Sequence, residues 1–565
     1  MKLYGNVMLS LLLVSLLSAI VSPTIADSHN ITYLEQNWTN KDRQYFYFAD
    51  QGSRLVAYDY FANLEQAQNK QLLRSDENML QFGFIPTEKS YNNPDGLPIG
   101  LARNGNQMGP TCAACHTQQI TYKDRTIRID GGQGFIDLQR FLTAIRSSLK
   151  ATLDDNEKFI RFQKRLYGET VSEQQQTLLK QTLQTEFEKR SRYDSRNYSD
   201  VGFGYGRTAA FDVILNTALE ATGEGNNTHP ITGLTNFPYI WDTPQHDYVE
   251  WNGSQSNTDV GALARNIGEV IGVFGDIETE SATWLGLIDG GYQSSIQVSE
   301  LRKLERIVSR LHSPIWPEIF PEIDTDIAKL GRGLYEQHCI QCHVDMDRTD
   351  PLRKIQVRMS TLDAIKTDPL MAENAINFVG KSGKLEGRAH YYDSGEKLEK
   401  QARAIHIANN LMIGILRNNP LQSYLAKRDA KKLGHPDVVH PPKYVDGKFI
   451  EQGEEVSDYA LLAYKARPLN GIWSSAPFLH NGSIPTLYQL LLPADQRVKQ
   501  FPLGYLEYDP VDVGYANKKT SNSFMFDTAA MGNSNSGHEF GTGYDGQPAL
   551  TEQQRWALIE YLKTL

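Results

Sequence analysis

Apolar side chains recur at helical spacing in several stretches of this chain, with polar segments between them. In the clearest set, successive apolar residues lie one or three positions apart: Phe135, Leu138, Phe141, Leu142 and Ile145. This spacing places the set on one face, so a helix with one buried side is predicted there. A second, charged helix is predicted over residues 173–189. Residues 200–275 are rich in Gly, Asn and aromatics and are expected to be mostly loops.

Two more helices are predicted in the last half of the chain. One contains Ala328–Tyr335. The other covers residues 551–565, whose apolar face is formed by Trp556, Leu558, Ile559 and Leu562. We expect the terminal helix to pack across the earlier one.

The chain has 565 residues, which exceeds one ordinary domain. Residues 318–324 follow two prolines and are expected to be a linker. The predicted parts are therefore residues 27–320 and residues 321–565.

The N-terminus has the pattern of a secretion signal. Lys2 precedes the apolar stretch Val7–Ile20, and small residues follow at Thr24–Ala26. The alternative is an uncleaved membrane anchor, but the apolar run is shorter than the ~20 residues that span a bilayer. We therefore predict a signal peptide over residues 1–26, a periplasmic or secreted protein, and no membrane span after cleavage.

The net charge limits the classes of molecule that this protein is expected to bind. The net charge is −10 and no long basic run is present, so nucleic acid is excluded as an expected partner. A neutral, hydrophobic small molecule remains compatible with this composition.

All four cysteines of the chain belong to two Cys-x-x-Cys-His motifs. These motifs are Cys112-Ala113-Ala114-Cys115-His116 and Cys339-Ile340-Gln341-Cys342-His343. Two thiols at this spacing can attach to a haem, and the adjoining His can ligate its iron. A Cys₄ zinc site would not explain the two histidines, and no thioredoxin-like context supports disulfides. Two covalently bound haem c groups are predicted, on His116 and His343.

These features together predict a mainly α fold. It should contain two cytochrome c-like haem domains with long loop insertions and little β-structure.

The segment Leu469–Leu487 contains Ala476-Pro477-Phe478-Leu479-His480-Asn481-Gly482. It resembles the signature of dihaem bacterial cytochrome c peroxidases and their MauG relatives, apart from Phe478 where Tyr is usual. The resemblance covers most of the chain and implies an oxidoreductase.

Further segments resemble the rubber oxygenases and the dihaem fatty-acid dioxygenases. They are Asn93–Pro98, Phe237-Pro238, Trp251–Ser254, Ala264–Asn266 and Glu507–Pro510. This resemblance implies chemistry with O₂ on an unsaturated hydrophobic substrate.

The first haem is the expected site of that chemistry. The peroxidases carry a distal His soon after the first motif, whereas residues 117–132 contain none. In the rubber oxygenases a Phe covers the open haem face, and Phe237 matches its distance from His116. Phe237 is therefore assigned with His116 to the catalytic site, although a core role is the alternative.

Three side chains are candidates for the second ligand opposite His343. His538 is preferred because the superfamily places a ligand between the signature and the terminal helix. Met531 and His480 follow in that order, with a hydrogen-bonded structural role as the alternative for His480.

Buried haem propionates need cationic partners, and Arg265 and Arg207 are the candidates. Trp251 is the candidate for assisting electron transfer between the two haems.

Three functions remain open at this point. The first is an O₂-dependent dioxygenase acting on a fatty acid or polyisoprene, with the second haem as redox partner. The second is a hydrogen peroxide reductase fed by a small cytochrome or cupredoxin, in which Glu269 replaces the missing distal His. The third is a non-catalytic dihaem electron carrier.

Overall fold

The computed structural model describes residues 31–565 except 281–282, 285–287, 391–394, 452, 454–456, 545 and 547. The predicted signal peptide lies outside the described residues. Among those that are described, no helix is both long and apolar enough to cross a membrane.

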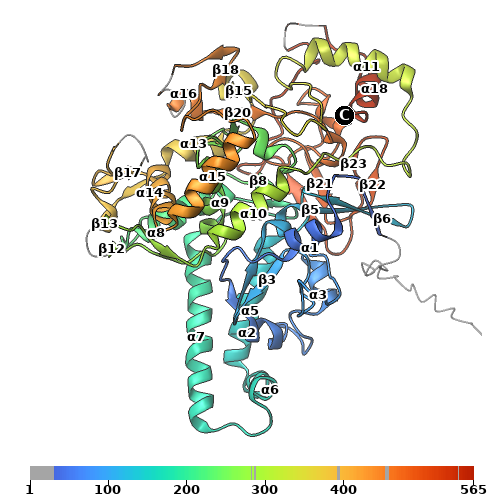
Figure 1. Cartoon of the computed structure of the whole chain (residues 1–565). Coiled ribbons are helices and arrows are strands. Elements are labelled where there is room, and N and C mark those ends of the chain that lie inside the picture. Colours follow the sequence, from blue (N-terminus) through green and yellow to red (C-terminus); the bar gives the residue numbers. More distant parts are fainter. Residues whose placement is uncertain are drawn as a thin grey trace, which may run out of the picture.

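Figure 1 labels the helices and strands in chain order. The helices are α1 Asn40–Phe48, α2 Tyr58–Asn63, α3 Asp76–Gln81, α4 Cys112–Cys115, α5 Leu138–Asp154, α6 Asn156–Tyr167, α7 Glu173–Arg196, α8 Ala210–Ala221, α9 Gly261–Gly272, α10 Val298–Val308, α11 Thr325–His338, α12 Leu362–Ile365, α13 Leu370–Asn377, α14 Ala404–Arg417, α15 Pro420–Lys432, α16 Asp458–Leu461, α17 Leu487–Leu490 and α18 Glu552–Leu562, with 3₁₀ turns η2 Thr243–Gln245, η3 Gly383–Leu385 and η4 Ile472–Ser474.

The strands are short and form many small sheets. They are β1 Ile31–Tyr33, β2 Val56–Ala57, β3 Leu101–Asn104, β4 Gln107–Pro110, β5 Thr117–Tyr122, β6 Arg125–Asp130, β7 Arg207–Thr208, β8 Thr235–Asn236, β9 Tyr248–Val249, β10 Gln255–Ser256, β11 Ile277–Glu278, β12 Thr283–Trp284, β13 Ile288–Asp289, β14 Gln293–Ser294, β15 Arg358–Thr361, β16 Val379–Lys381, β17 Gln401–Arg403, β18 Tyr444–Val445, β19 Lys448–Phe449, β20 Ala463–Ala466, β21 Gln500–Leu503, β22 Tyr508–Asp509, β23 Gly514–Tyr515 and β24 Phe524–Asp527.

The prediction of a mainly α fold with little β-structure is wrong. Helices make up 38% and strands 16% of the structure, so the fold is mixed. The long segments between helices are buried in many places, and buried backbone groups need hydrogen bonds, which short ladders supply. Residues 200–275, expected to be mostly loops, also hold α8 and α9, which have 12 residues each.

The hairpin directly after the first Cys-x-x-Cys-His motif shows how strand structure was missed. β5 pairs antiparallel with β6, and β1 pairs parallel with β6. Lys123 and Asp124 form the two-residue turn with φ of 46° and 61°, the left-handed conformation that such a turn requires. Ile120, Ile127 and Ile129 are fully buried on this sheet.

The four predicted helices are confirmed, although Phe135, part of the first predicted apolar face, lies before the helix begins. α5 buries Leu138, Phe141, Leu142 and Ile145, and Asp137 caps its first turn by accepting a hydrogen bond from the Arg140 N–H. The charged helix is α7, which begins at a capping box formed by Ser172 and Gln175. In Figure 1, α7 extends away from the body of the molecule.

The terminal helix packs across the helix before the second motif, as predicted. α18 lies against α11 (Figure 1). A Cβ added to Gly331 would lie 1.9 Å from the Ala557 carbonyl oxygen, so only glycine permits this approach. The Tyr335 and Tyr561 rings meet beside it, with centroids 5.2 Å apart. The crossing fixes where the chain enters Cys339.

A layer of helices stands on the other side of the molecule. α9 contacts α8, α10 and α14, and α15 contacts α10. Glycines on α9 allow this close packing. A Cβ at Gly268 would lie 2.9 Å from the Met412 sulfur, and one at Gly272 would lie 2.7 Å from Ile214. This layer supplies one wall of the first of two internal cavities.

Candidate haem centres

The first motif opens into an internal cavity. Cys112, Cys115 and His116 line it together with Phe237. His116 donates its Nδ1–H to the carbonyl of Pro238 at 2.8 Å. The remaining nitrogen, Nε2, is thereby left as the one that can ligate a metal. Burial lowers the pKa of His116 to about 4, so the imidazole is neutral at pH 7, as a ligand must be.

Two glycines hold the first motif in place. A Cβ at Gly100 would lie 2.3 Å from the Ala114 Cα, and one at Gly134 would lie 2.6 Å from the Ala114 carbonyl oxygen. The Gly134 N–H also donates to the Cys115 carbonyl at 2.7 Å. The motif is therefore clamped between two backbone segments.

The second motif lines a separate cavity. Cys339, Cys342 and His343 face it together with His538 and His480. His343 donates its Nδ1–H to the Arg467 carbonyl at 2.6 Å, which leaves its Nε2 free, as at His116. Because the two cysteine pairs line different cavities, they do not assemble a Cys₄ zinc site.

His343 and His538 lie close together across the second cavity. Their ring centroids are 6.1 Å apart. Two imidazoles that bind one metal at about 2 Å per bond hold their ring centres roughly 6 Å apart. Burial lowers the pKa of His538 to about 3 and also lowers that of His343, so both rings are neutral. The pair fits a single iron between the two rings.

The other two candidates for the second ligand lie elsewhere. The Met531 side chain is 61% exposed. His480 lines the same cavity, but its ring stacks on Tyr464 with centroids 4.0 Å apart. The geometry therefore favours His538.

A buried arginine fixes the loop that carries His538. Arg497 donates to the carbonyls of Asn535 and Gly537 at 2.6 and 2.8 Å. The His538 N–H donates to the Ile365 carbonyl at 2.9 Å. His538 itself adopts a φ of 50°, a conformation that non-glycine residues hold only when their surroundings impose it. The loop is thus held rigidly in a position that presents the ring to His343.

The two cavities share one wall. Its members line both cavities and come from two distant segments: Asn236, Pro238, Tyr239, Trp251, Lys465 and Arg467. The segments are joined where the Lys465 N–H donates to the Trp251 carbonyl at 2.8 Å. Trp251 also makes an edge contact with His480, with centroids 6.4 Å apart. Trp251, predicted as an inter-haem residue, therefore lies between the two motifs.

Unpaired polar atoms in this wall match what a haem would add. The Arg467 Nε and the Trp251 Nε1 are buried and have no hydrogen-bond partner among the described residues. Such atoms are costly unless a bound group satisfies them. Haem propionates are anionic acceptors, and the side chains of Lys465 and Arg467 bring nitrogen donors to this wall, where burial lowers the pKa of both groups. The residues present therefore fit a haem in each cavity.

The two predicted propionate partners differ in position. Arg265 lines the first cavity and is ion-paired with Glu305 at 2.6 Å. Arg207 is fully buried outside both linings, where it donates to the carbonyls of Phe203 and Asn481 and to the Asn533 side chain. Arg207 therefore has a structural role, holding three segments of the chain together.

Comparisons with known proteins place the chain in a family. The chain is 31% identical to the uncharacterised protein y4iJ of Sinorhizobium fredii over 602 aligned positions, covering 95% of this chain and 93% of that protein. The chain belongs to the y4iJ family. It is also 26% identical to the uncharacterised protein y4iM of the same organism, over 62% of this chain and 70% of that protein.

A second comparison concerns the shared wall. The family model described as RoxA-like, cytochrome c-like matches residues 463–502, which include Lys465, Arg467 and His480. This match supports a RoxA-like dihaem cytochrome family, and its cytochrome c domain implies a c-type haem and a haem c oxidoreductase. Such domains are typically periplasmic or extracellular, which agrees with the predicted localisation.

The first cavity differs from the second in which side chains face the motif. Phe237 is 3% exposed and lies in the cavity lining. The helical layer contributes an apolar wall: Ile214, Val270, Leu301, Leu304 and Val308. Among the described lining residues, His116 is the one histidine, and Met371 supplies a thioether. The cavity is thus mostly apolar and lacks a second imidazole.

Three carboxyl groups also line the first cavity, those of Glu250, Glu269 and Glu305. Glu269 lies on α9, and burial together with hydrogen-bonded Glu250 raises its pKa to about 8. Glu269 is therefore protonated at neutral pH.

Sequence reasoning named Glu269 but missed Glu250, Lys465 and Arg467. A signal existed for the last two, because cations at i and i+2 of an extended segment share one face.

Proposed function

We propose that this RoxA-like protein is an exported dihaem c oxidoreductase that oxygenates an unsaturated hydrophobic chain with O₂. The motifs at His116 and His343 hold one haem c each, which makes residues 27–320 and 321–565 the two haem domains. The observation that carries the proposal is the asymmetry between the cavities. The second cavity presents two facing histidines, whereas the first presents one histidine and an apolar wall.

A haem with one protein ligand can bind O₂, whereas a haem with two strong ligands transfers electrons. Phe237 and the helical layer would exclude water from the first cavity and hold a hydrocarbon chain there. Insertion of both oxygen atoms into a C–H bond beside a double bond gives a hydroperoxide. This reaction consumes one O₂ per substrate and needs no external reductant. Trp251 lies where it can couple the two haems.

The test is O₂ uptake by the holoprotein given oleate, without peroxide or reductant. The proposal predicts uptake that matches hydroperoxide formation mole for mole. A parallel sample with polyisoprene separates the two substrate classes. If neither substrate causes uptake while hydrogen peroxide is turned over, the proposal fails.

A second candidate function is peroxide reduction, and the Glu250–Glu269 carboxyl pair supports it. A peroxidase needs a group that moves a proton during O–O cleavage. Glu269 holds a proton at neutral pH and lies in the first cavity. Its partner would be a small donor cytochrome or cupredoxin. This function predicts hydrogen peroxide-dependent oxidation of such a reduced donor. The rate in Glu269→Gln should be at least ~100-fold slower, the lower end of the ~10²–10⁴-fold range for acid–base catalysis.

A further inference from the structure

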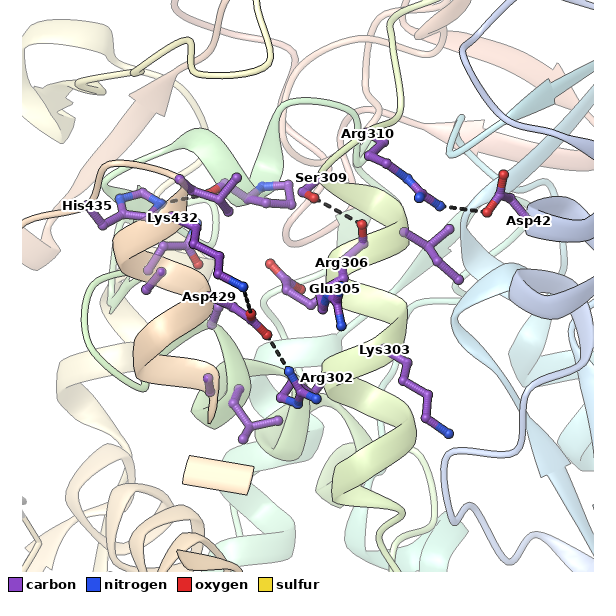
Figure 2. A pocket seen from close by; sticks show the side chains of 18 of the residues that line it. Asp42, Arg302, Lys303, Glu305, Arg306, Ser309, Arg310, Asp429, Lys432 and His435 are labelled. Atoms are coloured by element: carbon purple, nitrogen blue, oxygen red, sulfur yellow. Dashed lines mark hydrogen bonds and ion pairs between the residues drawn. The ribbon is translucent and has the colours of Figure 1, made fainter. Parts of the chain in front are cut away.

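A surface groove lies beside the first cavity, between α10 and α15. Figure 2 shows it from close by, with Arg302, Lys303 and Arg306 on α10 and Asp429 and Lys432 on α15. The groove differs from the two haem cavities in having a charged rim. Its floor is formed by apolar side chains from α9, α10 and the C-terminal end of α15: Leu263, Ile307, Ala430 and Leu433, with Pro244 of η2 beside them.

One side chain belongs to both the groove and the first cavity. Glu305 lines each of them, and in Figure 2 it points into the space between the two helices. Its Oε2 accepts hydrogen bonds from Arg265 at 2.6 Å and from Asn266 at 2.9 Å. Its Oε1 is buried without a partner among the described residues. At Glu305, therefore, the groove and the cavity share a polar side chain as their common wall.

Asn257 adds to that wall from the groove side. It lines the groove, and its Oδ1 accepts a hydrogen bond from Arg265 at 3.2 Å. Arg265 lines the first cavity. Because Arg265 meets Glu305 and Asn257 through their side chains, these contacts can open by rotamer changes without unfolding a helix.

The rim is suited to an anion. Arg302 is paired with Asp429 at 2.5 Å, and Arg310 with Asp42 at 2.6 Å. Arg306 is exposed and makes no side-chain hydrogen bond or ion pair with another described residue. A free guanidinium beside an apolar floor matches a molecule with a carboxylate head and a hydrocarbon tail.

We propose that this groove is the access route by which a long-chain carboxylate reaches the first cavity. Arg306 binds the carboxylate at the mouth, the apolar floor holds the adjoining chain, and the Arg265–Glu305 pair is the closure that parts to admit the tail. This inference rests on the proposed function and makes it more specific. A neutral polyisoprene chain would gain nothing from Arg306.

Binding measurements on the holoprotein test the head-group site. Oleate and oleyl alcohol share a chain and differ in the carboxylate. Arg306→Gln should weaken oleate binding about fivefold, the size expected for a partly exposed ion pair, and leave oleyl alcohol binding unchanged. Arg125→Gln, at another exposed arginine, is the matched control and should change neither. Equal losses for both ligands, or no loss for oleate, would overturn the site.

Stopped-flow absorbance tests the closure. Glu305→Gln keeps the shape of the side chain but removes the charge that holds Arg265. The oleate-induced change in haem absorbance should then develop about threefold faster, because the closure parts more readily. An unchanged rate would exclude Glu305 as the closure. These outcomes are independent of oxygenation: binding that depends on Arg306 without O₂ uptake refutes the proposed function alone, and normal uptake with an unaltered KM in Arg306→Gln refutes the groove alone.

Discussion

The two cavities of this chain begin from the same five-residue pattern and end in different chemistry. In both, the motif histidine donates its Nδ1–H to a backbone carbonyl, so that its Nε2 faces the cavity. In the second cavity, a rigid loop places the ring centroid of His538 6.1 Å from that of His343. In the first, the facing wall comes from α8, α9 and α10 and is mostly apolar. The difference shows that the surrounding insertions, and not the motif, decide what each cavity can do.

The largest expected effect comes from removing the second imidazole. His538→Ala should convert the second haem from low-spin to high-spin and allow cyanide to bind, since His343 then has no opposing ligand. Electron paramagnetic resonance and cyanide titration measure both changes. Met531→Ala, at an exposed position, is the control and should leave the spectrum intact. An unaltered low-spin signal in His538→Ala would instead favour His480 as the second ligand.

Enlarging the first cavity should produce the next largest effect. Phe237→Ala removes a buried ring, so O₂ should dissociate at least tenfold faster while both haems remain attached. Flash photolysis measures the rate, and the pyridine haemochrome assay counts the haems. Met371→Leu keeps the cavity volume and should leave the rate unaltered. Normal O₂ release in Phe237→Ala would remove the ring from the site.

Loosening the His538 loop should have a smaller effect on the second cavity alone. Arg497→Ala deletes charged hydrogen bonds to the Asn535 and Gly537 carbonyls, and each lost buried hydrogen bond of this kind costs about 1–3 kcal/mol. We expect a lower midpoint in thermal unfolding and a partial high-spin signal from the second haem. Arg332→Ala, on the exposed face of α11, should change neither. A lower unfolding midpoint without a spectral change would show that Arg497 stabilises the loop but does not control the position of His538.

The most gradual expected effect is a pH dependence of stability that belongs to the first cavity. The pKa of Glu269 is about 8 in the folded protein and about 4.5 in the unfolded chain. Between these values only the folded state keeps the proton, so the free energy of unfolding should fall as pH rises from 4.5 to 8. The slope is at most about 1.4 kcal/mol per pH unit. Urea unfolding of the native protein and Glu269→Gln should differ by this slope, and parallel curves would contradict it.

Local patterns in the sequence were sufficient for the motifs and for the helices at α5, α7, α11 and α18. Apolar spacing and the residues that form a Cys-x-x-Cys-His motif act over short distances, so one segment determines them. The β5–β6 hairpin was also local, but its alternation was obscured by polar residues such as Gln118 and Gln119, which the sheet buries or half-buries. This hairpin is one of the many short ladders that the mainly α prediction missed.

The wall between the cavities could not be predicted from any single segment of the sequence. Glu250 and Trp251 meet Lys465 and Arg467 only after more than two hundred residues of chain have folded between them. Arg207 illustrates the opposite case: it was a predicted partner of a haem propionate, but its guanidinium donates to backbone carbonyls. Long-range contacts decide whether a buried cation faces a cavity or the chain itself.

The most direct test of the asymmetry is the electron paramagnetic resonance spectrum of the ferric holoprotein with its haem count. The account predicts two haems per chain, one low-spin and one high-spin in equal amounts, with cyanide converting the high-spin signal alone. Two low-spin haems that bind no cyanide would contradict it and make the protein an electron carrier.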